Sequence, residues 1–348
     1  MGSTGSSTPD GRVTIVVVPR ERFSSARESL ESVFENTQPP FELVYVDAGS
    51  PRSLRRWLRS QAAEHGFRLL ERDGYLSPNQ ARNVGLDAVT TEFAVFIDND
   101  VGVRAGWLER LVDCADSTGA TVVGPVICEA QDPYLAAEHP VDTIHFAGGR
   151  ATISRGRDDS QVIRDEIYRQ HEEMEAVRGE LAREQMSLTE FHCFLARSER
   201  IRALGGFDEG LLSTREHVDL SLSVAEHGGT LWFEPDAVVV WSATAGLRFS
   251  DLPYYMLRWS DDWGRASLEH FRRKWNLAYD QYFERRIASL SERRQSRLII
   301  PLVRRITFGH GSPRLEGLLK RIESRVNKHL SDRYSRQQSQ ATPVSGAA

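Results

Sequence analysis

The chain has 348 residues, of which 40% are apolar and 27% are charged, a composition ordinary for a globular protein of one or two domains. A net charge of -5 argues against general nucleic-acid binding, which favours a strongly basic domain. Three scattered cysteines are too few for a disulfide framework and indicate a reducing compartment such as the cytoplasm. No apolar run approaches the roughly 18 residues of a membrane span.

The first third of the chain alternates between strands and helices. Residues 1–12, rich in Gly, Ser and Thr, are expected to be a disordered leader. The elements predicted after it are a strand at 13–18, a helix at 24–36, a strand at 41–46, a helix at 54–65 and a strand at 67–71. This alternation implies parallel strands whose carboxyl ends meet at one crevice, where Pro19 and Asp47 follow their strands.

The stretch EFAVFIDNDVGV is the clearest chemical signal. Its apolar run predicts a strand buried on both faces, and the run ends abruptly in Asp98, Asn99 and Asp100. Two carboxylates so close together repel each other unless a cation lies between them, and hard oxygen ligands suit Mg²⁺ or Mn²⁺. An ordinary acidic turn is the competing interpretation.

The middle of the chain continues the pattern with one unusual segment. The predicted elements are a helix at 79–88, a helix at 107–117, strands at 120–127, 145–153, 188–198 and 230–240, and a helix that opens within 211–228. Arg82 and Asn83 are placed near the exposed side of the first helix, and Gly85 should allow close packing. Residues 158–187 are highly charged and predict a long helix or a mobile insertion, with an acceptor-binding lid as an alternative.

The last hundred residues are helical and basic. Residues 254–277 are aromatic, and residues 285–336 contain 14 Lys or Arg against 4 Asp or Glu. The slightly favoured interpretation is a helical region, 251–335, that packs on the catalytic domain or on a second subunit, before a disordered tail at 336–348. The alternative is peripheral contact with the inner face of the plasma membrane, since basic amphipathic helices can lie on anionic membranes.

Four blocks, VTIVVVP, FELVYVDAGS, FIDND and ALGGFDEGLLSTREHVDLSL, together resemble the inverting GT-A glycosyltransferases of family 2. The resemblance runs from about residue 13 to residue 241. It implies an α/β fold, with a Rossmann-like, mostly parallel sheet flanked by helices. It also implies a catalytic domain at 13–250, divided into a nucleotide half (13–127) and an acceptor half (128–250).

The resemblance also implies the residues of the site. A divalent cation, Mn²⁺ or Mg²⁺, would bind Asp100 and Asp98. The nucleotide would lie against Pro19, Arg20, Asp47, Arg82, Asn83, Asp98 and Asn99.

The chain departs from the family pattern in two places. The family's Glu-Asp pair is Glu216-His217 here, so the base could be Glu216, His217 or Asp219. We favour a carboxylate over the imidazole, and Glu216 over Asp219, although acids at a helix start also act as simple caps.

The second departure is Trp241, which stands where many relatives carry a metal-binding histidine, and an indole has no lone pair for a metal. Either Asp100 and water suffice, or His192 or His145 contributes.

The implied activity is transfer of a sugar, from UDP in the leading hypothesis, to a saccharide, lipid-linked or other hydroxyl acceptor. One alternative is a degenerate glycosyltransferase fold that binds nucleotide without turnover. Another is a sugar nucleotidyltransferase, which the absence of glycine from VVVPRERFSS disfavours. A homo-oligomer is a further expectation.

Overall fold

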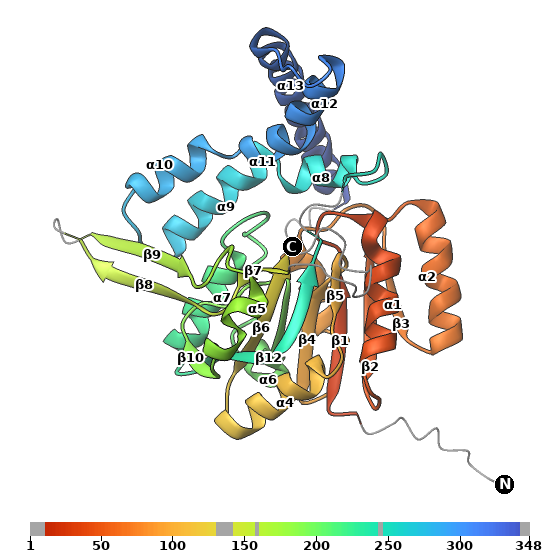
Figure 1. The fold of residues 1–348 in the computed structure, drawn as a ribbon, viewed down its shortest axis with the longest axis vertical. Coiled ribbons are helices and arrows are strands. Elements are labelled where there is room, and N and C mark those ends of the chain that lie inside the picture. The colour runs from red at the N-terminus through yellow and green to blue at the C-terminus, as the bar shows by residue number, and fades with distance from the viewer. Residues whose placement is uncertain (1–10, 130–141, 157–159, 243–245, 342–348) are drawn as a thin grey trace, which may run out of the picture. The chain divides into compact units, whose positions relative to one another are not determined.

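The computed structural model describes residues 11–129, 142–156, 160–242 and 246–341 (Figure 1). The chain divides into two compact units. The larger unit consists of residues 1–154, 163–209 and 216–250, and the smaller one of residues 155–162, 210–215 and 251–348.

Among the described residues, ten strands form one sheet in the order β10-β12-β6-β11-β4-β1-β2-β3, with β5 paired to β12 and β7 paired to β6. The strands are β1 (Val13–Val18), β2 (Glu42–Ala48), β3 (Arg68–Arg72), β4 (Phe93–Asp98), β5 (Val101–Val103), β6 (Val122–Glu129), β7 (Thr143–Phe146), β10 (Glu184–Met186), β11 (Cys193–Arg197) and β12 (Leu231–Trp241). A separate two-stranded sheet consists of β8 (Gly149–Arg155) and β9 (Gln161–Ile167).

The sheet is curled, and helices flank it (Figure 1). In the larger unit they are α1 (Ala26–Asn36), α2 (Arg52–His65), α3 (Pro78–Leu86), α4 (Trp107–Thr118), α5 (Met174–Val177), α6 (Ser198–Ala203) and α7 (Glu216–Glu226). Helix α3 packs on β1 and β2, and α4 packs on β6 and β12. The predicted close approach at Gly85 is confirmed, because a Cβ there would lie 2.2 Å from a methyl group of Val16.

The parallel half of the sheet agrees with the prediction. β1 pairs in parallel with β2 and with β4, and every residue of β1 and β4 is buried. In this register Val18 lies beside Asp98, so the carboxyl ends of the strands meet at one edge. The polar residues that follow β1, β2 and β4 are therefore brought together.

Beyond β4 the sheet is mixed, because β11 enters antiparallel to both β4 and β6. Cys193 pairs with Ile97, and the carbonyl of His192 accepts the amide of Asp98 at 3.0 Å. The residues that precede β11 consequently lie at the carboxyl end of β4. Sequence order alone did not predict this, because an antiparallel insertion reverses which end of a strand reaches the crevice.

The expectation of a long charged helix at 158–187 is wrong. The described part of this segment forms β9, the short α5 and β10, and the outer positions of β9 are exposed or half-buried. Charged residues occupy the solvent-facing side of a strand as readily as that of a helix. A high density of charge therefore does not distinguish a strand from a helix.

Both ends of the chain also differ from expectation. Residues 1–10 lie outside the described residues, but Arg12 is ordered and pairs with Glu92 at 2.7 Å and Asp116 at 2.9 Å. The expected disordered tail at 336–348 is wrong for residues 336–341, which continue helix α13, and residues 342–348 lie outside the described residues.

The smaller unit is helical: α8 (Leu252–Arg258), α9 (Asp261–Lys274), α10 (Gln281–Ala288), α11 (Glu292–Arg294), α12 (Ile300–Ile306) and α13 (Pro313–Ala341). The fully buried Arg294 joins these helices, because its guanidinium binds Asp261 at 2.8 Å and Glu323 at 2.6 Å. Within the described ranges, no helix combines the length and apolar character required to cross a bilayer.

Candidate active site

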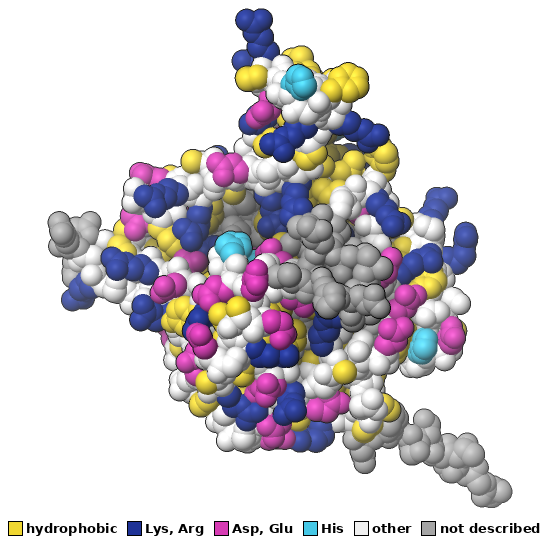
Figure 2. Space-filling view, viewed as in Figure 1, with side chains coloured by type: hydrophobic (Ala, Val, Ile, Leu, Met, Phe, Trp, Pro, Cys, Tyr) yellow, Lys and Arg dark blue, Asp and Glu magenta, His cyan; other side chains and the backbone are white. Residues whose placement is uncertain are grey.

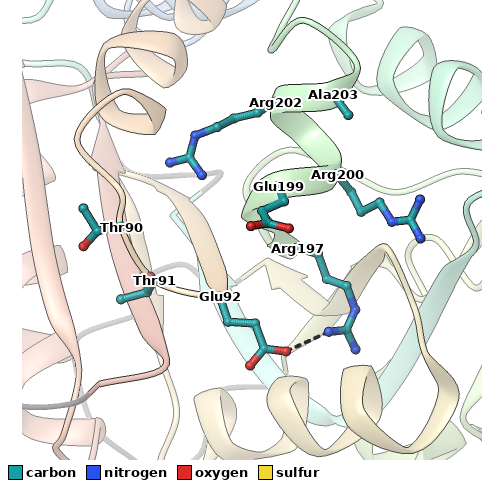
Figure 3. A pocket seen from close by; sticks show the side chains of 8 residues that line it. All are labelled: Thr90, Thr91, Glu92, Arg197, Glu199, Arg200, Arg202 and Ala203. Atoms are coloured by element: carbon teal, nitrogen blue, oxygen red, sulfur yellow. Dashed lines mark hydrogen bonds and ion pairs between the residues drawn. The ribbon is translucent and has the colours of Figure 1, made fainter.

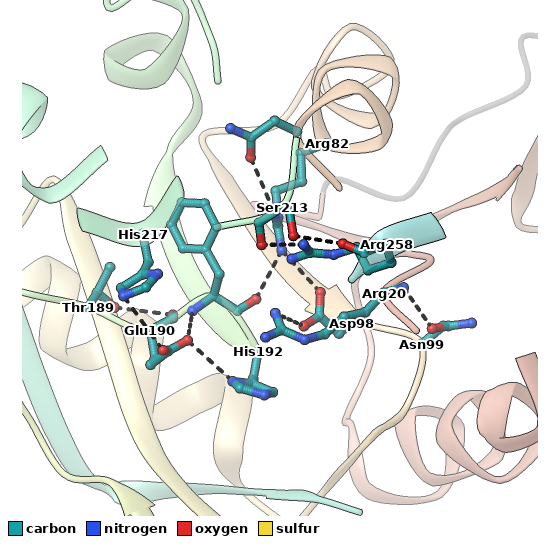
Figure 4. Close-up of polar contacts among 12 residues, drawn as sticks. Arg20, Arg82, Asp98, Asn99, Thr189, Glu190, His192, Ser213, His217 and Arg258 are labelled. Carbon is teal, nitrogen blue, oxygen red and sulfur yellow. Dashed lines mark hydrogen bonds and ion pairs between the residues drawn. The ribbon is translucent and has the colours of Figure 1, made fainter. Parts of the chain in front are cut away.

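The carboxylate at the end of β4 is held by two arginines from different elements. Arg20 Nη1 donates to Asp98 Oδ2 at 2.9 Å, and Arg82 Nη2 donates to Asp98 Oδ1 at 3.1 Å (Figure 4). The side chains of Asp98 and Arg82 are fully buried. Each oxygen of Asp98 is thus committed to a guanidinium, and this favours an arginine-binding role for Asp98 over the metal-binding role that the sequence assigned to it.

Arg82 is not on an exposed side of its helix, contrary to the prediction. Ser77 and Gln80 form a capping box that starts α3, and this sets the direction in which Arg82 projects. Its guanidinium lies 4.4 Å from the centre of the Phe191 ring and also donates to the carbonyl of Phe191 at 3.3 Å. A buried arginine is tolerated here because a carboxylate, a carbonyl and an aromatic face receive it.

Arg20 lies immediately after β1, where the sequence predicted it. Its amide donates to Asn99 Oδ1 at 3.1 Å, which ties the loop after β1 to the loop after β4. Burial lowers the pKa of Arg20, but the carboxylates of Asp98 and Glu190 outweigh burial, and the net pKa is raised. Its positive charge is therefore permanent.

Asp100 is the carboxylate that lacks a partner. It is fully buried, and neither of its oxygens has a hydrogen-bond partner among the residues that the structure describes. Burial and the nearby carboxylate of Glu21 raise its pKa to about 7. Buried acceptors are nearly always satisfied in proteins, so two unsatisfied oxygens at this edge fit a divalent cation that would complete the site.

Two other predicted nucleotide contacts have structural partners. Asp47 accepts Arg55 Nε at 2.7 Å and the amide of Ser50 at 3.2 Å. Asn83 accepts the amide of Phe207 at 2.8 Å and donates to the carbonyl of the same residue at 2.9 Å. Asp47 remains at the converging strand ends. The Asn83 side chain instead binds the backbone of Phe207, directly after the turn at Gly205 and Gly206.

The three candidate bases lie at the head of α7. Glu216 and Asp219 are 6% and 4% exposed, and His217 is half-buried. The segment before β11 is tied to this helix, because the amide of Thr189 donates to Ser221 Oγ at 3.1 Å. This tether brings Glu190 beside His217.

Glu190 is a site residue that the sequence analysis missed. Its Oε1 lies 3.8 Å from His217 Nε2, and its Oε2 lies 3.3 Å from His192 Nδ1. Burial alone would raise the pKa of Glu190, but nearby histidines, His217 first, hold that pKa well below its usual range. The only signal in the sequence was a Glu-Phe-His triplet directly before a strand.

The two histidines considered as substitutes for a metal ligand meet at Trp241. The ring centre of His192 lies 4.6 Å from that of Trp241, and the ring centre of His145 lies 5.1 Å from it. Burial, followed by the positive charge of Arg20, lowers the pKa of His192 well below its usual range. His192 is therefore a neutral imidazole at neutral pH.

A basic pocket of about 610 Å³ lies elsewhere, beside the amino end of β4 (Figure 3). Arg197 in this pocket binds Glu92 at 2.8 Å and the carbonyls of Ala115 and Ala120. Arg202 donates to the carbonyls of Leu86 and Val89. These guanidiniums mainly donate hydrogen bonds to backbone carbonyls. The candidate active site is therefore the one at the opposite end of β4.

The chain is similar to known glycosyltransferases. Residues 14–170 match the family model described as glycosyl transferase family 2. The chain is 28% identical over 238 residues to the pre-mycofactocin glycosyltransferase of Mycobacterium tuberculosis, which covers 68% of this chain and 44% of the relative. It is 30% identical over 116 residues to the succinoglycan biosynthesis protein ExoM of Rhizobium meliloti, covering 33% of this chain and 29% of that protein.

The chain thus spans less than half the length of these curated relatives. Among solved structures, GalNAc-T7 with UDP, GalNAc and Mn²⁺ aligns with a TM-score of 0.51 at 16% identity. The alignment covers 81% of this chain and 57% of that one. At this identity the likeness concerns the fold alone.

Proposed function

We propose a specific reaction for this chain on the premise that it is a family 2 glycosyltransferase with the GT-A fold. It transfers a sugar from a nucleoside diphosphate sugar, with UDP as the expected carrier, to an acceptor hydroxyl with inversion. The observation that carries the proposal is the unpartnered, buried carboxylate of Asp100 beside the Arg20–Asp98–Arg82 cluster.

The electrostatics of this edge suit a diphosphate. Two guanidiniums face one carboxylate at Asp98, so this group of three carries a net positive charge. The side chain of Asp100 and the polar atoms around it would hold Mn²⁺ or Mg²⁺, which supplies positive charge to the diphosphate as it leaves. Arg20 supplies a fixed positive charge without reorganisation, because Asp98 and Asn99 already position it.

Inversion requires a base that removes the acceptor proton on the face of the sugar opposite the leaving group. Three ionisable side chains at the head of α7 could do so: Glu216, His217 and Asp219. We assign the role to His217, with Glu190 as the group that orients it. The support is the position of Glu190 Oε1, 3.8 Å from His217 Nε2, from which a small side-chain movement would form the histidine and carboxylate hydrogen bond of enzymatic general bases.

The experiment that tests the proposal is a thermal-shift titration with UDP, GDP, dTDP and CDP, each with and without Mn²⁺. A ligand at 100 times its Kd stabilises the folded state by about 2.7 kcal/mol, or roughly 5–10 °C for a unit of this size. We expect a shift with UDP that requires Mn²⁺.

The titration also separates the competing functions. The titration selects one nucleotide. The proposal further requires that a nucleotide sugar built on it release free nucleoside diphosphate when it is incubated with the protein. Binding without release indicates the degenerate binding module, and absence of any shift contradicts a nucleotide-dependent function altogether.

The smaller unit carries a surface that is both apolar and basic. Six large apolar side chains on or beside α12 and α13 are at least 43% exposed: Leu302, Ile306, Phe308, Leu318, Ile322 and Val326. Residues 297–328 also carry eight Lys or Arg against two Glu. Figure 2 shows hydrophobic and basic side chains side by side over α12 and α13. We propose that this surface binds anionic lipid, in line with a lipid-linked or envelope acceptor at the inner face of the membrane.

Replacing Phe308 by Ser should weaken binding to vesicles that contain phosphatidylglycerol by tenfold or more. Full burial of a phenylalanine is worth about 1.5–3 kcal/mol, and 1.4 kcal/mol corresponds to a factor of ten. Phe249 is the matched control, because both phenylalanines are 92% exposed, but Phe308 lies in the turn between α12 and α13 whereas Phe249 precedes α8. Sedimentation with anionic and with neutral vesicles measures the effect. Equal losses in the two variants, or no preference for anionic vesicles, would contradict the lipid assignment.

A further inference from the structure

Three side chains from separate segments form a compact set of metal-binding groups in the larger unit. One ligand atom each from His145, Glu190 and His192 lie within 4.8 Å of one another. His145 is on β7, and Glu190 and His192 immediately precede β11, so the antiparallel insertion of β11 brings the set together. His145 is far from the other two in the sequence, so no short motif contains all three.

The buried imidazole of His192 faces the carboxylate of Glu190. It is 1% exposed, and neither ring nitrogen has a hydrogen-bond partner among the described residues, although Glu190 Oε2 lies 3.3 Å away outside hydrogen-bond geometry. A fully buried ring with two unused nitrogens is unfavourable without a ligand. A cation at the centre of this set would accept a lone pair from the ring and satisfy it.

His145 has the second feature expected of a metal ligand. Its Nδ1 lies 2.6 Å from Glu129 Oε1, at the end of β6. Histidines that bind metals commonly donate their other ring N–H to a carboxylate, which fixes the tautomer and leaves Nε2 as the ligand. This pair leaves Nε2 of His145 available for an ion.

The surroundings favour a transition metal. The indole of Trp241 packs against both imidazoles and is only 4% exposed, so it forms an apolar wall. Two imidazoles and one carboxylate suit Zn²⁺, Mn²⁺, Co²⁺ or Fe²⁺, whereas Mg²⁺ and Ca²⁺ prefer oxygen ligands alone.

We propose that His145, Glu190 and His192 bind one divalent transition-metal ion, and that Glu129 holds His145 in the binding tautomer. This site uses different side chains from the Asp100 site and does not need nucleotide. It goes beyond the proposed function, since the cluster would bind the ion whether or not the chain transfers sugar. An ion here would add positive charge at the edge of the sheet that Arg20 also faces.

The test is equilibrium dialysis of the full, metal-stripped chain against Zn²⁺, Mn²⁺ and Mg²⁺ without nucleotide, followed by elemental analysis. We expect one Zn²⁺ per chain, weaker binding of Mn²⁺ and no retention of Mg²⁺. Changing His192→Ala or His145→Ala should weaken Zn²⁺ binding at least 100-fold, and Glu129→Gln by about 10–100-fold. The exposed control His227→Ala should bind Zn²⁺ like the unmodified chain.

Two results would overturn the proposal: no stoichiometric Zn²⁺ on the unmodified chain, or histidine variants that bind Zn²⁺ as tightly as the unmodified chain does. Circular dichroism of the metal-free variants establishes whether each one folds. Glu129→Gln keeps the site intact in shape, so its affinity decides the matter if a histidine variant does not fold. Zn²⁺ binding with no nucleotide shift would overturn only the proposed function, and the reverse result would overturn only the metal site.

Discussion

Replacing Asp100 by Asn is expected to abolish the Mn²⁺-dependent thermal shift with UDP and to lower sugar transfer by about 10²–10³-fold. Loss of one preorganised group that stabilises developing charge has this magnitude in other enzymes. The physical reason is that Asp100 is the carboxylate of the FIDND stretch with unpartnered oxygens, since Asp98 is committed to two arginines. Nucleotide release from the sugar donor that the titration selects measures the loss.

The same variant separates a binding defect from unfolding. Burial raises the pKa of Asp100 to about 7, above its ordinary value, so the ionised side chain destabilises the fold as pH rises through 7. Asn carries no charge, and without ligand its melting temperature at pH 8 should equal or exceed that of the unmodified chain. Asp73→Asn, at a fully exposed carboxylate, is the control for loss of one charge. A retained Mn²⁺-dependent shift in Asp100→Asn would remove the metal role from this residue.

Replacing His217 by Ala is expected to lower the rate of transfer by about 10²–10⁴-fold, the usual contribution of a positioned general base. Nucleotide binding should be unchanged, because the contacts described for His217 are with Glu190 and the ring of Phe191. Initial rates at saturating donor measure the effect, and the thermal shift with UDP and Mn²⁺ confirms that the donor site is intact.

Glu216→Gln and Asp219→Asn test the carboxylates that the sequence favoured. Both side chains are buried more deeply than that of His217, which suits a structural role at the start of α7. We expect a loss of less than tenfold in each at equal folded fraction. A large loss in Glu216→Gln together with near-normal rates in His217→Ala would falsify the assignment and restore the carboxylate.

Local pattern predicted the parallel half of the fold well, because its signals are short-range. Buried strands appear as apolar runs, and β1 and β4 lie within one residue of their predicted bounds. The same pattern placed Arg82 wrongly. A helical period treats arginine as polar and therefore exposed, whereas the partner that buries it, Asp98, is 16 residues away on another element.

The cluster around Trp241 shows what local pattern lacks. His192 and His145 were considered singly as replacements for a missing ligand, but Glu190 and Glu129 were not considered at all. The four residues come from two strands and one loop, and the antiparallel entry of β11 makes them neighbours.

The residue pattern was enough to predict the class of fold, the position of the acidic strand end and the basic, apolar character of the last helices. These follow from hydrophobic period and composition, which act over a few residues at a time. The tertiary structure decided that Asp98 binds arginines while Asp100 remains unpartnered, and it placed Glu190 between His217 and His192. Such pairings depend on strand order and direction, because interactions among charged groups act over a few ångströms in space regardless of their separation along the chain.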